Sequence, residues 1–254
     1  MCIRDSRWDV MERNRFAWMS ERARRNAELF GLYRVDHVVG LYRTYFRTGA
    51  PDSPGTFTPA EEPAQIRNGE KMIEVFSRGA RVIAEDLGTV PRFVRASLTR
   101  CGVPGYRVLR WEREWEERGQ PWRDPAAWPA LSVATSGTHD TESLADWFEE
   151  IGEEERAALL ALPAFASLRS GAPGHFDDQV RDAFLEALYE AGSDLVLLPL
   201  QDALGTRERV NVPGTVNDEN WTYRMPADVT RLALDRATRE RLRGLAVRSR
   251  RATV

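Results

Sequence analysis

The chain has 254 residues, of which 42% are hydrophobic and 30% charged, and its 36 basic residues nearly balance 39 acidic ones. This composition is ordinary for a globular domain and excludes disordered, collagen-like and disulfide-stapled chains. The balanced charge gives no basic surface of the kind that binds nucleic acid, and no stretch approaches the roughly 20 apolar residues of a membrane helix. We therefore expect neither nucleic acid nor a membrane as a partner.

The first third of the chain predicts a helix, a strand and a second helix. Apolar residues recur at three- and four-residue steps from Trp8 to Phe30, which predicts one amphipathic helix. Residues 32–35 have strand character and lead into Asp36. After a loop rich in Gly, Pro, Ser and Thr at 48–58, the pattern predicts a helix over 59–78, closed by Gly79 as a left-handed cap.

The rest of the chain alternates strand and helix patterns. A β-branched run at 80–85 is followed by a Gly-Thr-Val-Pro turn and a helical segment to about Thr99, which forms a βα unit. Further strands are expected at 105–110, 131–136 and 195–200, and further helices at about 141–162, 176–191 and 228–247. This alternation predicts an α/β fold with a parallel sheet and right-handed crossovers.

Three of the predicted strands are followed by carboxylates, namely Asp36, Glu85 and Asp140. The carboxyl ends of parallel strands meet at one rim, where α/β folds place their sites. Two carboxyl groups across a sugar acetal suit glycoside chemistry, because one stays ionised while the other serves as the acid. Taken singly, a loop Asp is more often a turn former or helix cap, and Asp86 should point to the opposite face from Glu85.

Other chemistries find little support. His37 and His139 lie directly beside candidate carboxylates, but no His-x-x-x-His or Cys pair completes a metal site, so we expect no metal. The chain lacks a Gly-x-Ser-x-Gly elbow, a Gly-x-Gly-x-x-Gly fingerprint and a Walker loop, so we expect no nucleotide cofactor. Four aromatic residues near strand ends are candidates for stacking on sugars: Tyr33, Tyr42, Tyr45 and Trp221.

Four ordered segments resemble one known family. They are Arg34-Val-Asp-His-Val-Val-Gly40, Ile83-Ala-Glu-Asp-Leu-Gly88, Gly137-Thr-His-Asp140, and Asn211-Val-Pro-Gly-Thr215 followed by Asn220-Trp221. Their residues and separations resemble the signatures of the 4-α-glucanotransferases, the amylomaltase or disproportionating-enzyme family (glycoside hydrolase family 77). The likeness runs from about Trp8 to Pro226. We therefore expect residues 1–6 to be a non-family extension and 7–254 to be a partial catalytic barrel domain.

The resemblance implies a (β/α)₈ barrel and a role for each carboxylate. Asp36 would be the nucleophile, Glu85 the general acid and base, and Asp140 would hold the distorted sugar through its 2- and 3-hydroxyls. Three further residues would bind or orient within the site: Arg34, His139 and Asn211.

By the same resemblance, the reaction would transfer a maltooligosaccharide segment between α-1,4-glucans of the starch and glycogen type, with retention and without a cofactor. The glucan donor and acceptor would be the only partners. Two rivals remain: an α-amylase-type hydrolase, which would usually show Asn where this chain has Thr138, and a catalytically silent glucan-binding module.

Two features depart from the family pattern. Thr141-Glu142-Ser143 stands where the family commonly has Asn-Asp-Thr. The predicted strands correspond to about strands four to eight of the barrel, and nothing corresponds to strands one to three. We therefore expect the chain to be the C-terminal half of a longer enzyme, an expectation that an in-frame upstream stop codon without barrel sequence would contradict.

The compartment follows from the cysteines and from the start of the chain. Cys2 and Cys101 cannot form a disulfide framework, and Met1–Ser6 lacks the apolar core of a secretion signal. We expect the cytoplasm, while the oligomeric state is left open by the sequence.

Overall fold

The computed structural model describes residues 8–47, 54–168, 173–225 and 227–252. They fall into two compact units, one ending at Tyr106 and the other beginning at Arg107. The predicted extension at residues 1–6 lies outside the described residues and stays a prediction.

The first unit opens with two helices, α1 (Trp8–Arg13) and α2 (Ala17–Leu29). The prediction of one continuous helix is wrong here, because Arg15 and Phe16 adopt left-handed conformations with φ of 56° and 54°. A right-handed helix cannot continue through such residues. The break leaves the Phe16 side chain buried in the core of this unit.

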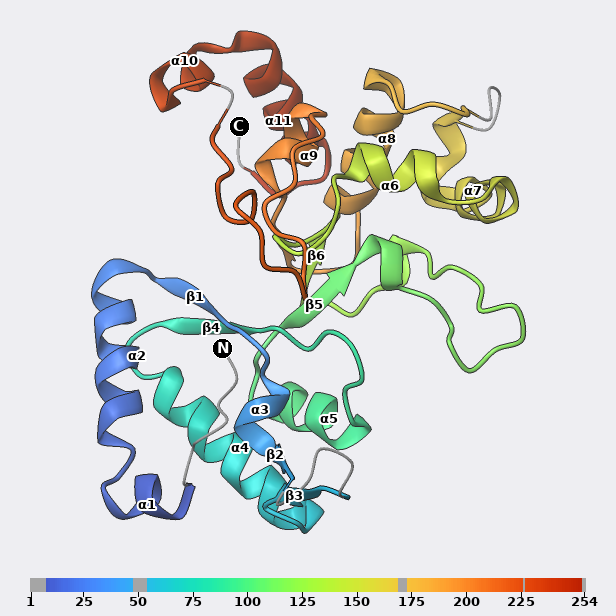
Figure 1. The fold of residues 1–254 in the computed structure, drawn as a ribbon. Helices are drawn as coiled ribbons and strands as arrows, with labels where there is room; N and C mark the ends of the chain where they lie inside the picture. Colours follow the sequence, from blue (N-terminus) through green and yellow to red (C-terminus); the bar gives the residue numbers. More distant parts are fainter. Residues whose placement is uncertain (1–7, 48–53, 169–172, 226, 253–254) are drawn as a thin grey trace. The chain divides into compact units, whose positions relative to one another are not determined.

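The first unit contains parallel strands (Figure 1). β1 (Leu32–Val35) pairs with β4 (Arg81–Ala84), and β4 pairs with β5 (Gly105–Val108). Val35 lies opposite Ala84 in the β1–β4 register. The predicted strands and their parallel direction are confirmed.

A short antiparallel hairpin joins β2 (Thr44–Phe46) to β3 (Thr56–Thr58). The rings of the opposed residues Tyr45 and Phe57 have centroids 5.1 Å apart. The prediction of a plain loop over 48–58 is therefore wrong for residues 56–58, while 48–53 lie outside the described residues.

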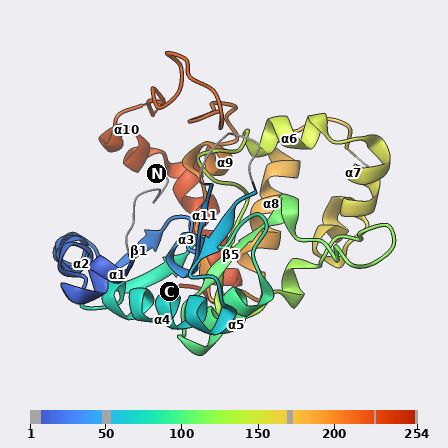
Figure 2. The ribbon, with the colours of Figure 1, turned by 60° about the horizontal axis from the view of Figure 1, so that its bottom comes forward.

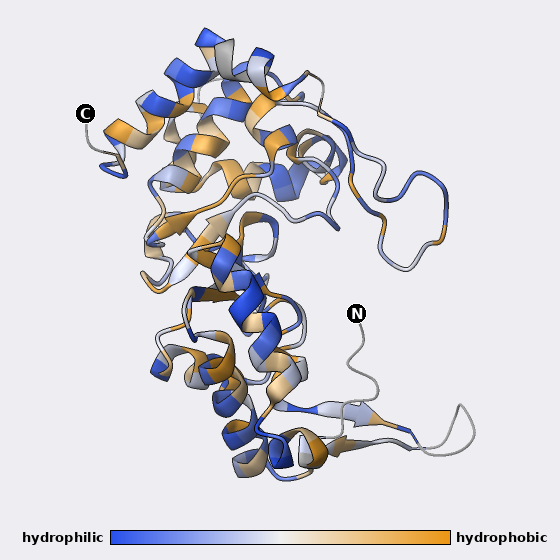
Figure 3. Cartoon of the chain, turned by 90° about the vertical axis from the view of Figure 1, so that its left-hand side faces the viewer, coloured by the Kyte–Doolittle hydropathy of each residue, from blue (hydrophilic) through white to orange (hydrophobic). Residues whose placement is uncertain are grey.

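Three helices, α3 (Val39–Tyr42), α4 (Glu62–Phe76) and α5 (Arg92–Arg100), lie on one side of β1 and β4 (Figure 1). Figure 3 shows hydrophobic and hydrophilic residues mixed along the helices; α4 buries Met72, Ile73 and Phe76, and α5 buries Val94 and Leu98. The helix predicted over 59–78 is confirmed with shorter ends, and Gly79 has the expected positive φ of 89°.

Helix α4 contacts α3 at Gly69, where a methyl group would overlap the ring of the fully buried Tyr42. Replacing Gly69 by Ala adds about 1 kcal/mol of helix propensity but costs about 1–3 kcal/mol of overpacking against that ring. We expect a net loss in the free energy of unfolding, measured by urea denaturation. Gly31→Ala is the control, because no atom lies within 4 Å of its added methyl; an equal effect of both changes would contradict the packing argument.

The Tyr42 hydroxyl donates to Ser97 Oγ at 3.0 Å, and burial raises the pKa of Tyr42 to about 12. Between its usual pKa near 10 and this value, only the unfolded chain releases the proton, so stability falls as pH rises from about 10. We expect the stability advantage of the native protein over Tyr42→Phe to shrink between pH 8 and pH 11; urea denaturation that shows a constant advantage would contradict this.

The second unit contains β6 (Ser132–Thr135) and β7 (Leu195–Val196), which pair in parallel with Val133 opposite Leu195. The strand predicted over 195–200 is too long. Pro199 instead stands at the N-cap of a short helix that begins at Leu200, and proline cannot donate to a strand ladder.

Helical segments pack around these strands, with α6, α7 and α8 grouped together and α11 against α8 (Figure 2). Their core contains Phe184, whose ring lies 4.6 Å from that of Phe165 and 5.6 Å from that of Phe148, between centroids. The segments are η1 (Leu109–Trp111), η2 (Pro125–Ala127), α6 (Leu144–Glu150), α7 (Glu153–Leu160), η3 (Pro163–Leu168), α8 (Asp178–Tyr189), α9 (Leu200–Leu204), α10 (Val229–Leu234) and α11 (Arg236–Arg248).

The predicted α/β class is confirmed, since every predicted strand forms and the predicted strands pair in parallel within each unit. The predicted helices over 141–162 and 228–247 are each divided into two. Across the part of the chain that the structure describes, no helix combines the length and apolar character needed to cross a membrane.

Candidate functional site

Two predicted carboxylates lie side by side in the first unit. Because Val35 pairs with Ala84, the next residues, Asp36 and Glu85, occupy matching positions at the carboxyl ends of β1 and β4. The ladder continues past the strands, with Glu85 N donating to Val35 O at 2.9 Å and Val38 N donating to Glu85 O at 3.1 Å. Adjacent strands are about 4.8 Å apart, so the two backbones are held at that spacing.

Asp36 is paired with an arginine from its own strand. Arg34 Nη2 lies 2.5 Å from Asp36 Oδ1, as expected for residues two apart on one face of a strand. The same guanidinium lies over the ring of Tyr106 on β5, 5.2 Å from its centroid. The Asp36 side chain is 62% exposed, so its carboxylate is oriented by Arg34 and open to a ligand.

Glu85 is fixed by two backbone amides. Its Oε2 accepts from His37 N at 2.7 Å and its Oε1 accepts from Leu87 N at 3.0 Å. His37 is left-handed, with φ of 46°, in the turn that follows Asp36. The turns after β1 and β4 therefore hold this carboxylate in one orientation beside Asp36.

Asp86 differs sharply from its neighbour. It is only 2% exposed, and its Oδ1 accepts from Tyr106 N at 2.7 Å. A methyl group on Gly105 would lie 2.6 Å from that oxygen, so Asp86 fills the space that the glycine leaves. Asp86 thus joins β4 to β5, in keeping with the interpretation that it is not catalytic.

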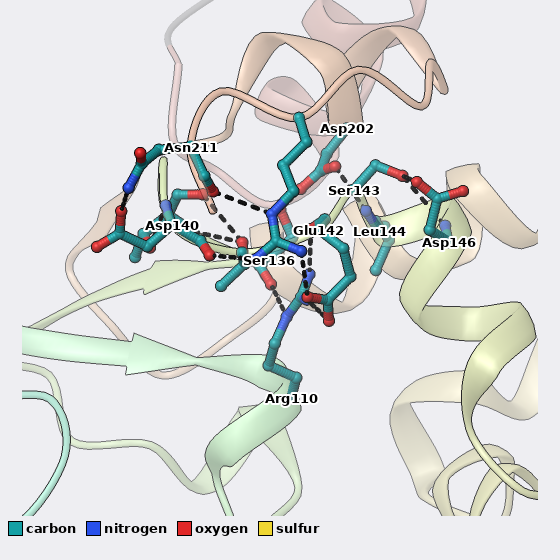
Figure 4. Close-up of polar contacts among 12 residues, drawn as sticks. Arg110, Ser136, Asp140, Glu142, Ser143, Leu144, Asp146, Asp202 and Asn211 are labelled. Carbon is teal, nitrogen blue, oxygen red and sulfur yellow. Dashed lines mark hydrogen bonds and ion pairs between the residues drawn. The ribbon is translucent and has the colours of Figure 1, made fainter. Parts of the chain in front are cut away.

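The third predicted carboxylate, Asp140, lies in the second unit, on the turn between β6 and α6 (Figure 4). Asn211 Nδ2 donates to Asp140 Oδ1 at 2.6 Å, and His139 Nε2 lies 3.3 Å from the same oxygen. Arg209 Nη2 donates to the Asp140 carbonyl at 2.7 Å. The structure therefore brings together all three predicted site residues of this unit, although they are up to 72 positions apart in the chain.

An exposed aromatic ring lies next to this group. Trp221 is 62% exposed, and its ring centroid lies 5.2 Å from that of His139. Asn211 N donates to His139 O at 3.0 Å and Trp221 N to Val210 O at 2.8 Å, which ties the segment to the turn. Stacking of Trp221 on a sugar stays a prediction, with which its exposure agrees, whereas the prediction for Tyr42 is wrong, because Tyr42 is fully buried.

The sequence did not identify two buried charged residues that contact the Asp140 turn. Arg110 and Asp202 are 5% and 2% exposed, and both contact the turn that carries Asp140 (Figure 4). Burial lowers the pKa of Arg110 and raises the pKa of Asp202 from their ordinary values. Glu142, the partner of Arg110, stood out in the sequence only as a departure from the family pattern. Arg110 and Asp202 carry no comparable signal.

Within the described ranges, no group of three or more His, Cys, Asp or Glu side chains is placed to hold a metal ion. The carboxylates above are instead bonded to arginine, asparagine and backbone N–H groups. The expectation that no metal takes part stays a prediction.

The structure is therefore an α/β protein whose parallel strands are followed by turns that carry oriented carboxylates. Comparison with known families is more specific. The family model described as 4-alpha-glucanotransferase (glycoside hydrolase family 77) matches residues 5–230. The chain belongs to this family.

Individual relatives agree with the family match. The 4-alpha-glucanotransferase of Chlamydia trachomatis is 31% identical over 234 residues, which cover 88% of this chain and 43% of the relative. That of Thermus thermophilus is 31% identical over 228 residues, covering 86% of this chain and 43% of the relative. The chain thus spans under half the length of these curated relatives.

A solved structure confirms the fold. The amylomaltase from Streptococcus agalactiae in complex with acarbose matches 97% of this chain and 47% of its own, with a TM-score of 0.74 and 23% identity. The α/β fold of this chain therefore matches part of an amylomaltase.

Proposed function

We propose that this chain carries the catalytic carboxylates of a 4-α-glucanotransferase, which moves maltooligosaccharide segments between α-1,4-glucans by double displacement. The observation that carries the proposal is the placement of Asp36 and Glu85 at matching positions of two paired parallel strands. Retaining enzymes use two carboxyl groups about 5–5.5 Å apart, a separation that neighbouring strands about 4.8 Å apart readily supply.

In the first displacement, Asp36 attacks the anomeric carbon of the donor glucan and forms a covalent glucosyl ester. The glycosidic bond breaks, and protonated Glu85 gives its proton to the leaving oxygen, which departs as a 4-hydroxyl. The charge-assisted hydrogen bond from Arg34 occupies one oxygen of Asp36 and leaves the other available for the attack.

In the second displacement, Glu85 removes the proton from the 4-hydroxyl of an acceptor glucan. That oxygen attacks the anomeric carbon, the ester bond to Asp36 breaks, and the α-configuration is restored. The amide bonds from His37 and Leu87 hold Glu85 in place for both proton transfers. The two steps need no cofactor.

In this proposal Asp140 binds the 2- and 3-hydroxyls of the distorted sugar, and its oxygen is positioned by Asn211 and His139. Carboxylate–hydroxyl hydrogen bonds that strengthen as the ring flattens stabilise the transition state more than the ground state. Trp221 provides an exposed face for a neighbouring glucose unit.

Three finer assignments belong to the same proposal. The parallel strands correspond to about strands four to eight of a (β/α)₈ barrel, the donor and acceptor are both α-1,4-glucans, and the enzyme works in the cytoplasm.

The reaction is tested with the protein at the full length its gene encodes, incubated with maltotriose alone. Transfer yields glucose together with maltopentaose and longer products, resolved by chromatography. Glucose and maltose without longer products would overturn the proposal in favour of a hydrolase, and glucan binding without turnover would overturn it in favour of a binding module.

A further inference from the structure

The turn that carries Asp140 is fixed at both ends by one buried carboxylate. Asp202, on α9, accepts from Ser136 Oγ at 2.5 Å before the turn and from Leu144 N at 2.8 Å after it (Figure 4). With Asp202 only 2% exposed, both bonds are shielded from water. The span between Ser136 and Leu144 is thus clamped against α9.

A buried arginine, Arg110, also binds the same turn near both of its ends. Arg110 Nε donates to Ser136 O at 3.1 Å, Nη2 donates to Glu142 O at 3.2 Å, and Nη1 pairs with Glu142 Oε1 at 2.5 Å. The Arg110 side chain is 2% exposed and that of Glu142 is 28% exposed. Removing such charges from water is costly, and buried ion pairs are often no more stable than apolar replacements.

The Glu142 carboxylate also lies near a second arginine, Arg209. Its Oε2 lies 3.9 Å from Arg209 Nη1, and Arg209 donates to the carbonyl oxygens of Asp140 and Asn211 at 2.7 and 3.0 Å. A row of charges therefore leads from Arg110 through Glu142 to Arg209, and Arg209 holds the backbones of the two residues whose side chains bond to each other.

We propose that Arg110, Glu142 and Arg209 form a positioning triad that sets the Asp140–Asn211 contact in the geometry needed at the transition state. The proposal rests on the proposed function, since it assigns Asp140 to the distorted sugar. None of the three residues needs to touch the glucan; the triad acts through Asp140. Burying the charges of the triad costs stability, and what it provides is a precisely held loop around the reacting sugar.

The kinetic test uses Glu142→Ala in the full-length protein. Displacement of Asp140 by about 1 Å lowers kcat by about 10–100-fold, while KM changes by less than about threefold because ground-state contacts are spread along the glucan. Glu142→Gln keeps an acceptor for Arg110 and should recover most of kcat. Glu240→Ala is the matched control, because it removes an exposed Arg–Glu pair of 2.7 Å on α11.

A double-mutant cycle separates positioning from general stability. If the triad acts through Asp140, adding Glu142→Ala to Asp140→Asn lowers kcat no further. Multiplied losses, or a fall in kcat that merely follows a fall in melting temperature, would overturn the proposal.

Amide hydrogen exchange tests the positioning proposal without an activity measurement. Glu142→Ala should speed exchange of the Asn211 amide, which donates to His139 O, and leave unchanged the Leu197 amide, which donates to Ala134 O in the strand region. Unchanged exchange at Asn211 would overturn the positioning proposal even in an active enzyme. Faster exchange in a protein without transferase activity would support the positioning of the loop and overturn the proposed function instead.

Discussion

Replacing Asp36 by Asn is expected to abolish transfer, with kcat falling by at least about 10⁴-fold, because an amide cannot form the glucosyl ester. The fold should survive, since the Asp36 side chain is 62% exposed and, among the described residues, pairs with Arg34, two positions earlier in the chain. The measurement is the rate of glucose release from maltotriose, accompanied by a thermal melt.

The control for this change is Glu74→Gln, which neutralises an exposed carboxylate on α4 that pairs with Arg78 at 3.0 Å. Its rate should stay within about twofold of the native rate, because exposed pairs of this kind contribute little. An Asp36→Asn protein that retains a tenth or more of the native rate would contradict the nucleophile assignment.

Replacing Glu85 by Gln is expected to lower kcat for maltotriose by about 10²–10⁴-fold, because proton transfer to the leaving oxygen and from the acceptor is lost. Binding of maltoheptaose, measured by calorimetry, should be retained. Because Glu85 also accepts from His37 N and Leu87 N, part of the loss could come from a disturbed turn. An activated donor separates the two causes.

Maltosyl fluoride needs no protonation of its leaving group, so Glu85→Gln should release fluoride in a rapid first turnover, while Asp36→Asn should not. A slow first turnover in both variants would show that Glu85→Gln damages the site and would contradict its role as acid.

The fold was predictable where the chain signals its own local structure. The runs ending at Asp36 and Glu85 are compact, β-branched and bounded by turn residues, and both form the expected strands. The break at Arg15–Phe16 lacks such a signal, because neither residue is a usual choice for a left-handed conformation. The break accompanies the burial of the Phe16 side chain, which depends on tertiary packing. Strand β3 has only three residues and lies in a segment rich in turn formers.

The candidate site was likewise predictable only in part. The pairing of Asp36 with Glu85 follows from parallel strands alone, whereas Arg34 was expected to orient Asp36 only through the family resemblance. Asn211 was named as a site residue only through the family resemblance, and its contact with Asp140, 71 positions earlier in the chain, was not predicted. The buried partners beneath Asp140 could not be predicted, because a charge in an apolar stretch does not reveal which distant loop will neutralise it.

The central claim is that Asp36 forms a covalent bond to glucan while Glu85 moves the proton. It is tested most directly by treating the Glu85→Gln protein with maltosyl fluoride, digesting it, and locating any added mass by peptide mass spectrometry. We predict a maltosyl adduct on Asp36, in the peptide that contains Val35, and no adduct when Asp36 is replaced by Asn. An adduct on another residue, or turnover of the fluoride with inversion and no adduct, would contradict the account.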